Sequence, residues 1–323
     1  MKILVTGAGG FLGQFLARAL LADPSHTLVL TDLIDTPIPK GSQNAQNATV
    51  VKGDLIENLD KVVTPDLGAV YIFHGIMSSG SETNFDLGMK INLEYTRTLL
   101  EKIRHTCPKA RVIYASSQAV YGRPFPEVIT EDVFPSPEGS YGTEKLMCEC
   151  LINDYTRRGF LDGMSLRFPT VSVRPGAPSQ AASSFISGII REPLADQECV
   201  VPLTDRSFPS WVCSPRTLIN NLLHALKVPS DALPSHKRTI NAPGLMATVQ
   251  DMRDALAKVA GEDKLKYIKE VDDEDTGRIL RSWAYNFDNS LAYKLGYKAD
   301  TSFEQAVREY IEWTDEQKKL DSQ

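Results

Sequence analysis

The sequence has no long hydrophobic run. Among its 323 residues, no apolar stretch approaches the roughly 20 residues that a membrane-spanning helix needs. The chain opens on M-K-I-L-V-T-G, which is too short for a signal peptide and runs directly into glycines. An excess of basic charge is missing too: the chain has 35 Lys and Arg residues and 41 Asp and Glu residues, which gives a net charge of −6. We therefore expect neither a membrane nor a nucleic acid as partner.

Cysteines are few and follow no pattern. The five are Cys107, Cys148, Cys150, Cys199 and Cys213, and their spacing suggests no disulfide framework. Cys148 and Cys150 lie two residues apart in a predicted helix, so they point to different faces. No further ligands stand at the spacing of a zinc site. We predict reduced thiols, no bound metal and a cytoplasmic protein.

Short β-branched runs alternate with amphipathic segments through the first half of the chain. This rhythm is typical of a parallel sheet covered by helices on both faces. We predict strands at Lys2–Thr6, Thr27–Thr31, Thr49–Lys52, Ala69–Phe73, Arg111–Ser116 and Ser165–Phe168. The predicted helices between them include Phe11–Ala22, Phe85–Arg104 and Tyr141–Arg158. The fold class is α/β, with a Rossmann-type doubly wound parallel sheet.

Three glycines follow the first predicted strand in T-G-A-G-G-F-L-G. Gly7 allows a tight turn, Gly10 lets the backbone approach a pyrophosphate, and Gly13 lets helix and strand pack closely. The helix that opens at Phe11 and Leu12 then offers free N–H groups to the diphosphate. A strand before the glycines and an acid after them make this a dinucleotide-binding pattern.

Two aspartates follow the next predicted strands. Asp32 is placed to accept hydrogen bonds from a ribose diol and to repel a 2′-phosphate, and no arginine follows it, so NAD is favoured over NADP. Asp54 is placed to meet the adenine amino group, with Leu55 beside the ring. The alternative for both acids is an ordinary loop cap. His74 and Gly75, after the fourth strand, are predicted to line the cofactor.

Tyr141 and Lys145 stand in Y-G-T-E-K, one helical turn apart and on one face. A phenol is a poor base at neutral pH, and a fixed ammonium nearby favours the phenolate. We therefore expect Lys145 to lower the pKa of Tyr141. With the glycine loop and the serines ahead of it, this pair indicates hydride transfer to or from NAD.

The pattern changes after Phe168, where P-T-V-S-V-R-P-G-A-P reads as a loop leaving the sheet. We predict an NAD-binding domain over 1–168, with return segments near 213–242. A smaller substrate-binding lobe would comprise 169–212 and 243–323. The expected later elements are helices Arg216–Leu226, Val249–Ala260 and Phe303–Trp313, a strand Thr239–Asn241, an acidic surface segment Glu270–Asp275 and a frayed C-terminal tail.

At this point the chain resembles the extended short-chain dehydrogenases/reductases, the NAD-dependent epimerase/dehydratase family. The resemblance covers roughly residues 1 to 260 and rests on the glycine loop, A-S-S-Q-A-V-Y-G, Y-G-T-E-K and R-P-G. It implies that Ser117 holds the reacting oxygen, that Tyr141 exchanges its proton, and that Lys145 binds the nicotinamide ribose. It also implies that Asn92 lies near the active site and that the protein is a homodimer built on a four-helix interface.

Longer stretches are similar to the D-erythronate dehydrogenase subgroup of that family. They are H-G-I-M-S-S-G-S-E, N-F-D-L-G, S-Y-G-T-E-K, L-R-F-P-T-V-S-V-R-P-G and S-S-F-I-S-G-I-I-R-E-P-L. The resemblance implies NAD-dependent oxidation of a short sugar acid at C2. Gln118 and Ala119 stand where the family's dehydratases carry an acid pair, and Pro169 where its epimerases carry an asparagine. A nucleotide-sugar 4-epimerase remains the alternative, and a non-catalytic NAD(H) sensor a weaker one.

A small polyhydroxylated acid needs hydroxyl partners and a cation. Ser78, Ser79 and Ser81 suit its hydroxyls, as does Gln118 beside Ser117. Thr170, which we also assign to the cofactor, and Ser183 and Ser184 could add further hydrogen bonds. For the carboxylate, the candidates are Arg174 first and then Arg167 and Arg216, since a guanidinium grips a carboxylate bidentately. For each arginine the alternative is a structural ion pair.

Overall fold

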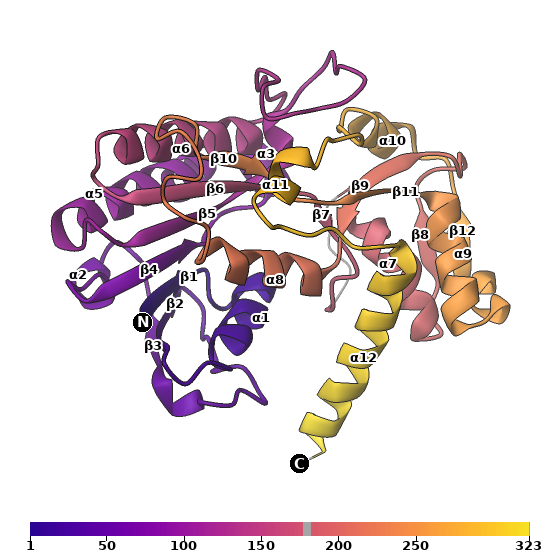
Figure 1. Ribbon diagram of the computed structural model, residues 1–323. Helices are drawn as coiled ribbons and strands as arrows, with labels where there is room; N and C mark the ends of the chain where they lie inside the picture. The colour runs from indigo at the N-terminus through magenta and orange to yellow at the C-terminus, as the bar shows by residue number, and fades with distance from the viewer. Residues whose placement is uncertain (177–181, 323) are drawn as a thin grey trace.

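The computed structural model describes residues 1–176 and 182–322 (Figure 1). A seven-stranded sheet, with every neighbouring pair parallel, forms its centre in the order β10-β6-β5-β4-β1-β2-β3. Its strands are β1 (Lys2–Thr6), β2 (Thr27–Asp32), β3 (Ala48–Lys52), β4 (Leu67–Ile72), β5 (Arg111–Ser117), β6 (Asp162–Phe168) and β10 (Thr239–Asn241). All six strands predicted for the first half are present, and so is the strand at Thr239–Asn241.

Both faces of the sheet are covered, which explains why its strands are continuous apolar runs. Ile3, Leu4 and Val5 are consecutive in β1, and all three are fully buried. In Figure 1, α5 (Tyr95–Thr106) and α6 (Ser140–Arg157) lie above the sheet, and α1 (Phe11–Leu20) and α8 (Pro215–Ala225) lie below it. The predicted Rossmann-type doubly wound sheet is thus confirmed.

Several short elements connect the sheet. They are η1 (Ala45–Asn47), α2 (Leu59–Val62), α3 (Ser78–Thr83), α4 (Phe85–Gly88), η2 (Met89–Glu94), η3 (Gln118–Val120) and α11 (Ser290–Lys294). The prediction of a single helix over Phe85–Arg104 is therefore wrong in detail. This segment consists of α4, the π-helical turn η2 and α5. A π-helical turn often marks a functional site. Here the π-helical turn carries Asn92, which is buried.

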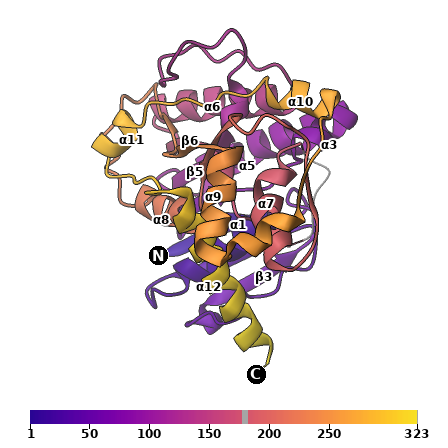
Figure 2. The same cartoon turned by 90° about the vertical axis from the view of Figure 1, so that its right-hand side faces the viewer.

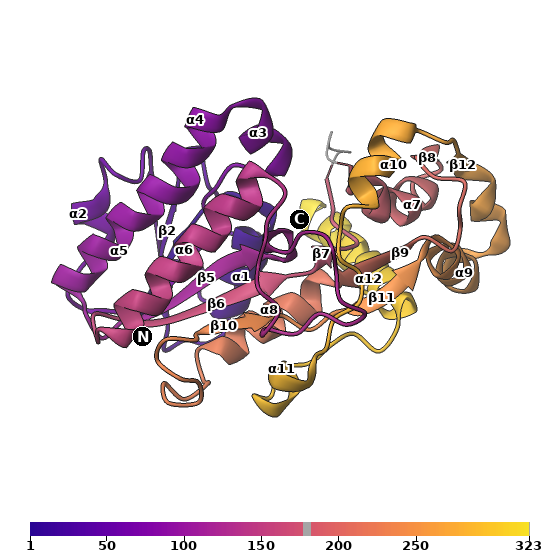
Figure 3. The same ribbon diagram turned by 90° about the horizontal axis from the view of Figure 1, so that it is seen from above.

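A smaller lobe lies beside the sheet domain (Figures 2 and 3). It holds a three-stranded sheet of β7 (Thr170–Val171), β9 (Pro209–Cys213) and β11 (Leu245–Thr248), and a parallel pair, β8 (Cys199–Val201) and β12 (Ile268–Glu270). Its helices are α7 (Ser184–Leu194), α9 (Val249–Ala260), η4 (Glu262–Tyr267), α10 (Glu274–Leu280) and α12 (Phe303–Asp321). A separate hydrophobic core includes Val173, Ile189 and Met252.

The lobe segments differ from the sequence-based expectation in two places. The acidic segment Glu270–Asp275 does lie at the surface, and it runs from the last residue of β12 into the start of α10. The tail predicted to fray is helical to Asp321, because Trp313 packs against Phe15, with 5.7 Å between ring centroids, and Glu316 pairs with Arg18. Tyr297, which we assigned to the lobe, is buried in the core of the sheet domain beside α8, so the division of the chain stays a proposal.

No helix of the described ranges is long and apolar enough to cross a membrane.

Asp300 fastens the start of α12 to the sheet domain. Its carboxylate is almost fully buried and accepts hydrogen bonds from the Ser214 amide at 2.6 Å and the Thr217 hydroxyl at 2.6 Å. Both donors lie at the amino end of α8, where a negative charge also meets the favourable end of the helix dipole. This contact joins the last segment of the lobe to the helix that packs under the sheet.

We predict that Asp300→Ala lowers the free energy of unfolding by about 2 to 3 kcal/mol, because two buried donors lose a charged acceptor. Urea unfolding of the purified protein would measure this. The matched control is Asp315→Ala, on the exposed part of α12, where the carboxylate lies 3.8 Å from Lys318 and little change is expected. Equal effects for the two variants would contradict the anchoring role.

Candidate active site

The glycine loop has the shape that a dinucleotide phosphate requires. Gly7 has a φ of +66°, and a Cβ there would come within 2.6 Å of the His74 nitrogen. A Cβ on Gly13 would come within 2.5 Å of the Gly7 carbonyl oxygen. The turn closes through a hydrogen bond from the Gly10 amide to the Gly7 carbonyl, and α1 begins at Phe11. The backbone is thus bare at the amino end of a helix, which fits a bound pyrophosphate.

Asp32 ends β2 beside this loop. Its carboxylate accepts a hydrogen bond from the Gly9 amide at 2.9 Å and a longer one from the Ile34 amide at 3.3 Å. Leu33 and Ile34, which follow it, are exposed and carry no charge. The position and the neighbours of Asp32 fit recognition of a ribose diol without a 2′-phosphate.

Asp54 already has partners within the protein. It accepts hydrogen bonds from the Tyr95 hydroxyl at 2.5 Å and the Ile56 amide at 2.8 Å. Burial acts to raise its pKa, but the hydrogen bonds from Tyr95, Ile56 and Glu57 outweigh it, so that the pKa lies below the ordinary value. Leu55 packs into the core on the α5 side of the sheet. Asp54 therefore has the contacts of the loop cap we named as its alternative, and adenine contacts for Asp54 and Leu55 stay predictions.

Ser117, Tyr141 and Lys145 come together where β5 ends and α6 begins. The Lys145 ammonium donates to the Ala115 carbonyl at 2.8 Å and lies 5.4 Å from the centroid of the Tyr141 ring. Ser117 ends β5 and lies close enough for its hydroxyl to hydrogen-bond Tyr141. The predicted trio thus faces one point at the carboxyl edge of the sheet, next to the loop after β4.

The electrostatics of the trio differ from our expectation. Burial, then the Glu144 charge, raises the pKa of Tyr141 to about 12, and the hydrogen bond with Ser117 only partly opposes this. Burial also lowers the pKa of Lys145 to about 8, against Cys148, Glu144 and Glu149, which favour its charged form. The expected lowering of the Tyr141 pKa by Lys145 is not observed, because desolvation dominates at both groups.

His74 is held neutral by its surroundings. Its Nδ1 lies 2.9 Å from the Thr6 hydroxyl and its Nε2 lies 3.2 Å from the Thr96 hydroxyl. Burial, with the Lys145 charge, lowers the pKa of His74 to about 3. A ring fixed on both sides and uncharged at neutral pH fits the predicted cofactor wall better than a proton carrier. Gly75 follows it directly in the loop after β4.

Two of the three candidate arginines make structural ion pairs. Arg167 is buried and donates to both Glu149 oxygens, at 2.9 and 2.6 Å. Arg216 lies on the surface and pairs with Glu312 at 2.8 Å. Arg174 differs, because no carboxylate of the described residues pairs with its guanidinium. Arg174 thus remains the strongest candidate for binding a substrate carboxylate.

Gln118 and Thr170 line a small cavity between the sheet domain and the lobe. The Gln118 Nε2 donates to the Thr170 hydroxyl at 3.2 Å, while its buried Oε1 has no partner among the described residues. The cavity has about 210 Å³ of empty space. Its other walls, which sequence reasoning largely missed, come from the lobe: Phe208, Pro209, Ser210, Trp211, Leu280, Trp283 and Ala284.

The remaining serine candidates divide. Ser78 and Ser79 are exposed at the start of α3, and Ser184 opens α7 in the lobe. Ser81 is fully buried and donates to Glu144 at 3.0 Å, so our assignment of its hydroxyl to a ligand is wrong. Sequence reasoning also missed Glu144 itself, although an acid directly before the lysine of Y-G-T-E-K was a visible signal.

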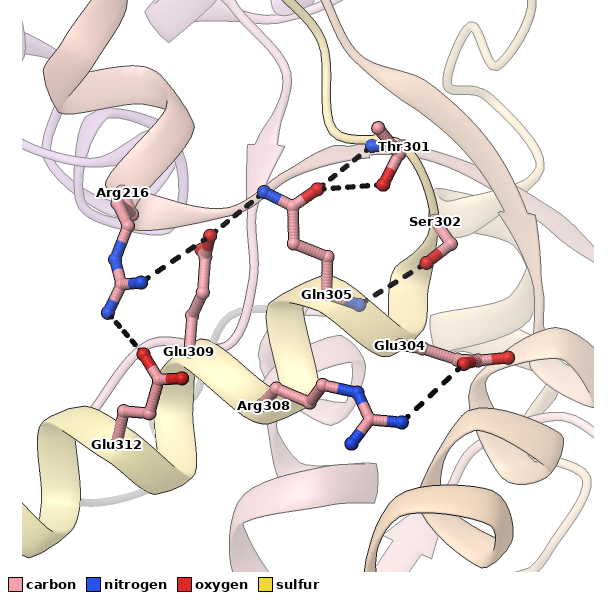
Figure 4. Close-up of a pocket in the computed structure, with 8 residues that line it drawn as sticks. All are labelled: Arg216, Thr301, Ser302, Glu304, Gln305, Arg308, Glu309 and Glu312. Carbon is pink, nitrogen blue, oxygen red and sulfur yellow. Dashed lines mark hydrogen bonds and ion pairs between the residues drawn. The ribbon is translucent and has the colours of Figure 1, made fainter.

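A larger hollow lies away from these residues (Figure 4). It has about 610 Å³ of empty space, open to solvent, between α8 and the first turns of α12. Its charged side chains pair with one another, as Arg216 does with Glu312 and Glu309, and Arg308 with Glu304. It lies on the α8 side of the sheet, whereas Tyr141 begins the helix on the other side. We therefore assign no part of the reaction to it.

Known proteins match both the sequence and the fold of this chain. The model of the NAD dependent epimerase/dehydratase family matches residues 3–207. The chain is 41% identical to D-erythronate dehydrogenase of Haemophilus influenzae, over 97% of this chain and 99% of that protein. It is 40% identical to D-erythronate dehydrogenase of Cupriavidus necator, over 97% and 98% of the two chains. The solved structure of a nucleoside-diphosphate-sugar epimerase from Agrobacterium tumefaciens superimposes with a TM-score of 0.90 at 36% identity, over 97% and 94% of the two chains.

The parallel sheet, the bare glycine loop and the acid after β2 define a dinucleotide-dependent enzyme of the Rossmann class. Within that class, the chain belongs to the NAD dependent epimerase/dehydratase family. Its cofactor is NAD, and it is an oxidoreductase.

We predict that the His74 ring does not titrate between pH 5 and 8, since its two ring nitrogens are held by threonine hydroxyls and its pKa is about 3. The Cε1 proton resonance of His74, assigned by its loss in His74→Gln, should keep one chemical shift over this range. A midpoint near 6.5, the usual value for histidine, would restore His74 as a candidate proton carrier.

Proposed function

We propose that the protein oxidises a short sugar acid at its C2 hydroxyl with NAD, and that D-erythronate is the first substrate to test. The observation that carries this proposal is the meeting of Ser117, Tyr141 and Lys145 beside a small cavity lined by Gln118 and Thr170. The two relatives named for D-erythronate, similar over nearly their whole length, support the choice of acid.

Ser117 and Tyr141 bind the hydroxyl that is oxidised. Ser117 ends β5, and its hydroxyl also accepts a hydrogen bond from the Ala119 amide at 3.1 Å, which fixes its direction. The substrate hydroxyl donates to Tyr141, which accepts its proton as the phenolate. NAD, when bound, supplies the acceptor for the hydride that leaves C2. C2 thereby loses a hydride and its hydroxyl loses a proton, so that C2 becomes the keto carbon of a 2-oxo acid.

Lys145 stabilises the phenolate form of Tyr141. The ammonium lies one turn further along α6 and is fixed by the Ala115 carbonyl, so it cannot swing away from the tyrosine. Because Tyr141 is hard to ionise in the protein, a cation at this point is needed to stabilise the phenolate. Lys145 loses its proton as the pH rises through about 8, so its support for the phenolate fades above that value.

The proposed residues around the cofactor follow the edge of the sheet. Gly7, Gly10, Phe11 and Leu12 would hold the diphosphate, and Asp32 the ribose of the adenosine. The nicotinamide side would be bordered by His74, Gly75, Asn92, Tyr141, Lys145 and Thr170. The carboxyl ends of parallel strands are where dinucleotides bind in open α/β sheets, which supports this arrangement.

Arg174 would bind the carboxylate of the substrate. Its guanidinium is partly buried near Arg191. Burial, and then the positive charge of Arg191, lower the pKa of Arg174 below its ordinary value. An arginine without an internal carboxylate partner among the described residues is suited to an external one. Ser78, Ser79, Ser184 and Gln118 would bind the hydroxyls of the acid.

A nucleotide-sugar 4-epimerase is the second candidate, favoured by the likeness to the nucleoside-diphosphate-sugar epimerase of Agrobacterium tumefaciens. Such an enzyme would use the same tyrosine but keep its NAD bound. Pro169 stands against it, because a buried proline side chain offers no amide to a nucleotide diphosphate.

A homodimer in the cytoplasm completes the proposal. In the family, two subunits commonly meet through paired helices, and the exposed side of α5 and α6 is where we place that contact. A closed two-fold arrangement is the usual default for such an interface.

Tyr141→Phe should lower turnover about a thousandfold, because the phenyl ring cannot accept the proton, while binding of NAD stays within about twofold of the parent. Initial rates of NADH formation and quenching of protein fluorescence by NAD would measure the two. Turnover retained in this variant would remove Tyr141 from the mechanism.

A panel of C4, C5 and C6 aldonates and uronates should show NADH formation that is fastest with a C4 acid, because the two relatives named for D-erythronate are similar to this chain over nearly their whole length. UDP-glucose and UDP-galactose, followed by chromatography, form the second arm. If the UDP-sugars are interconverted without net NADH and no acid is oxidised, the epimerase hypothesis would replace the dehydrogenase hypothesis.

A further inference from the structure

Glu144 is a buried carboxylate inside the catalytic motif. It lies on α6 three residues after Tyr141 and directly before Lys145, so it occupies nearly the same side of the helix as the tyrosine. Its side chain is fully buried. No lysine, arginine or histidine of the described residues lies within ion-pair distance of it. This contrasts with Glu149 on the same helix, which is buried but paired with Arg167 at 2.6 Å.

Only one oxygen of this carboxylate is bonded. Oε2 accepts hydrogen bonds from the Asn92 amide at 2.5 Å and from the Ser81 hydroxyl at 3.0 Å. Oε1 is buried and has no hydrogen-bond partner among the described residues. It lies against Gly88, where an added Cβ would come within 2.4 Å of it. A buried carboxylate with one unbonded oxygen is costly, and here a glycine leaves the room for it.

Through Asn92, the carboxylate orients the loop that follows β4. The Asn92 Oδ1 accepts from the Ile76 amide at 2.7 Å, and its Nδ2 donates to the Ile76 carbonyl at 3.0 Å. Because Glu144 accepts from that same Nδ2, the amide group cannot turn over and exchange its oxygen with its nitrogen. The loop therefore keeps Gly75 close to the catalytic lysine, and a Cβ on Gly75 would lie 3.9 Å from the Lys145 nitrogen.

The charge of Glu144 acts on both working residues. Burial is the larger cause of the raised pKa of Tyr141, and the charge of Glu144 raises that pKa further. At Lys145 burial lowers the pKa, and the charge of Glu144 opposes this by raising it. The other titratable groups around this pair come from β5, from α6 and from the segments after β4: Tyr114, Cys148, Glu149, His74 and Glu82. Of these, His74 is neutral, Glu149 is neutralised by Arg167, and Glu82 is exposed at the Ser140 amide.

We propose that Glu144 is a positioning residue: it holds the Asn92–Ile76 contact against the catalytic helix, and it places a buried carboxylate one helical turn from Tyr141 and next to Lys145. This deepens the proposed function and rests on it for the roles of Tyr141 and Lys145. In this proposal Glu144 acts through Asn92, Tyr141 and Lys145 and does not itself react.

Glu144→Gln tests the charge, because glutamine has the same shape and still offers an oxygen to Asn92 and Ser81. Loss of the negative charge makes Tyr141 easier to ionise and lets Lys145 lose its proton more readily. Both limbs of the pH profile of kcat should therefore move to lower pH, by about 1 unit. Asp154→Asn is the matched control, since it removes one charge from the same helix about 15 Å further along, where Asp154 is exposed beside Arg157.

A second readout needs no substrate and so separates this proposal from the choice of D-erythronate. In protein labelled with ¹³C at the lysine ε-carbon, the Lys145 signal, assigned by its loss in Lys145→Met, should titrate near pH 8. In Glu144→Gln the midpoint should be lower, and in Asp154→Asn it should not move. A Lys145 midpoint unchanged in Glu144→Gln would overturn the proposal, whatever the substrate proves to be.

Glu144→Asp tests the positioning part and also serves if the glutamine variant does not fold. Aspartate keeps the charge but is one methylene shorter, so it cannot reach Asn92 as Glu144 does. We expect the Lys145 midpoint to stay in place while binding of NAD weakens about tenfold, as the loop after β4 loosens. Unchanged NAD binding in a folded Glu144→Asp would overturn the positioning role.

Discussion

The parallel alignment of β1, β4 and β5 is the constraint on which the site depends. Their carboxyl ends lie along one edge of the sheet, so Gly7, His74 and Ser117 become neighbours although they are far apart in the chain. Burial of both faces fixes the register of these strands, since a slip of one residue would move each side chain from one close-packed core into the other, where it does not fit. The site thus inherits its precision from the hydrophobic cores above and below the sheet.

Desolvation is the second constraint, and it opposes the chemistry. The same burial that aligns Tyr141 and Lys145 raises the pKa of the phenol, so that it ionises less readily, and lowers the pKa of the ammonium, so that it loses its proton more readily. Two charges of opposite sign would restore the balance: NAD, which carries a positive nicotinamide when bound, and Glu144, which favours the charged lysine. The protein therefore places a costly, half-bonded carboxylate in the motif, and a glycine at position 88 leaves space for it.

The lobe is held to the sheet domain at several separate points. Asp300 binds the start of α8, Trp313 packs on α1, and Tyr297 lies in the core under the sheet. These contacts come from the last 30 residues or so of the chain, so the C-terminal segment positions the lobe that closes the cavity beyond Gln118. The boundary between the two bodies is therefore not a single point in the sequence.

The sequence by itself determined the fold class and the strands of the central sheet, and it predicted the pairing of Tyr141 with Lys145. These follow from local signals: apolar runs of strand length, glycines between a strand and a helix, and a tyrosine and a lysine one turn apart. The tertiary structure alone decided which arginine remains available, because the pairing of Arg167 with Glu149 joins residues of β6 and α6. It also decided that Ser81 faces inward, that the C-terminal tail is helical, and that Tyr141 is harder rather than easier to ionise. Each of these depends on contacts and burial between segments far apart in the chain, and local sequence patterns carry no record of them.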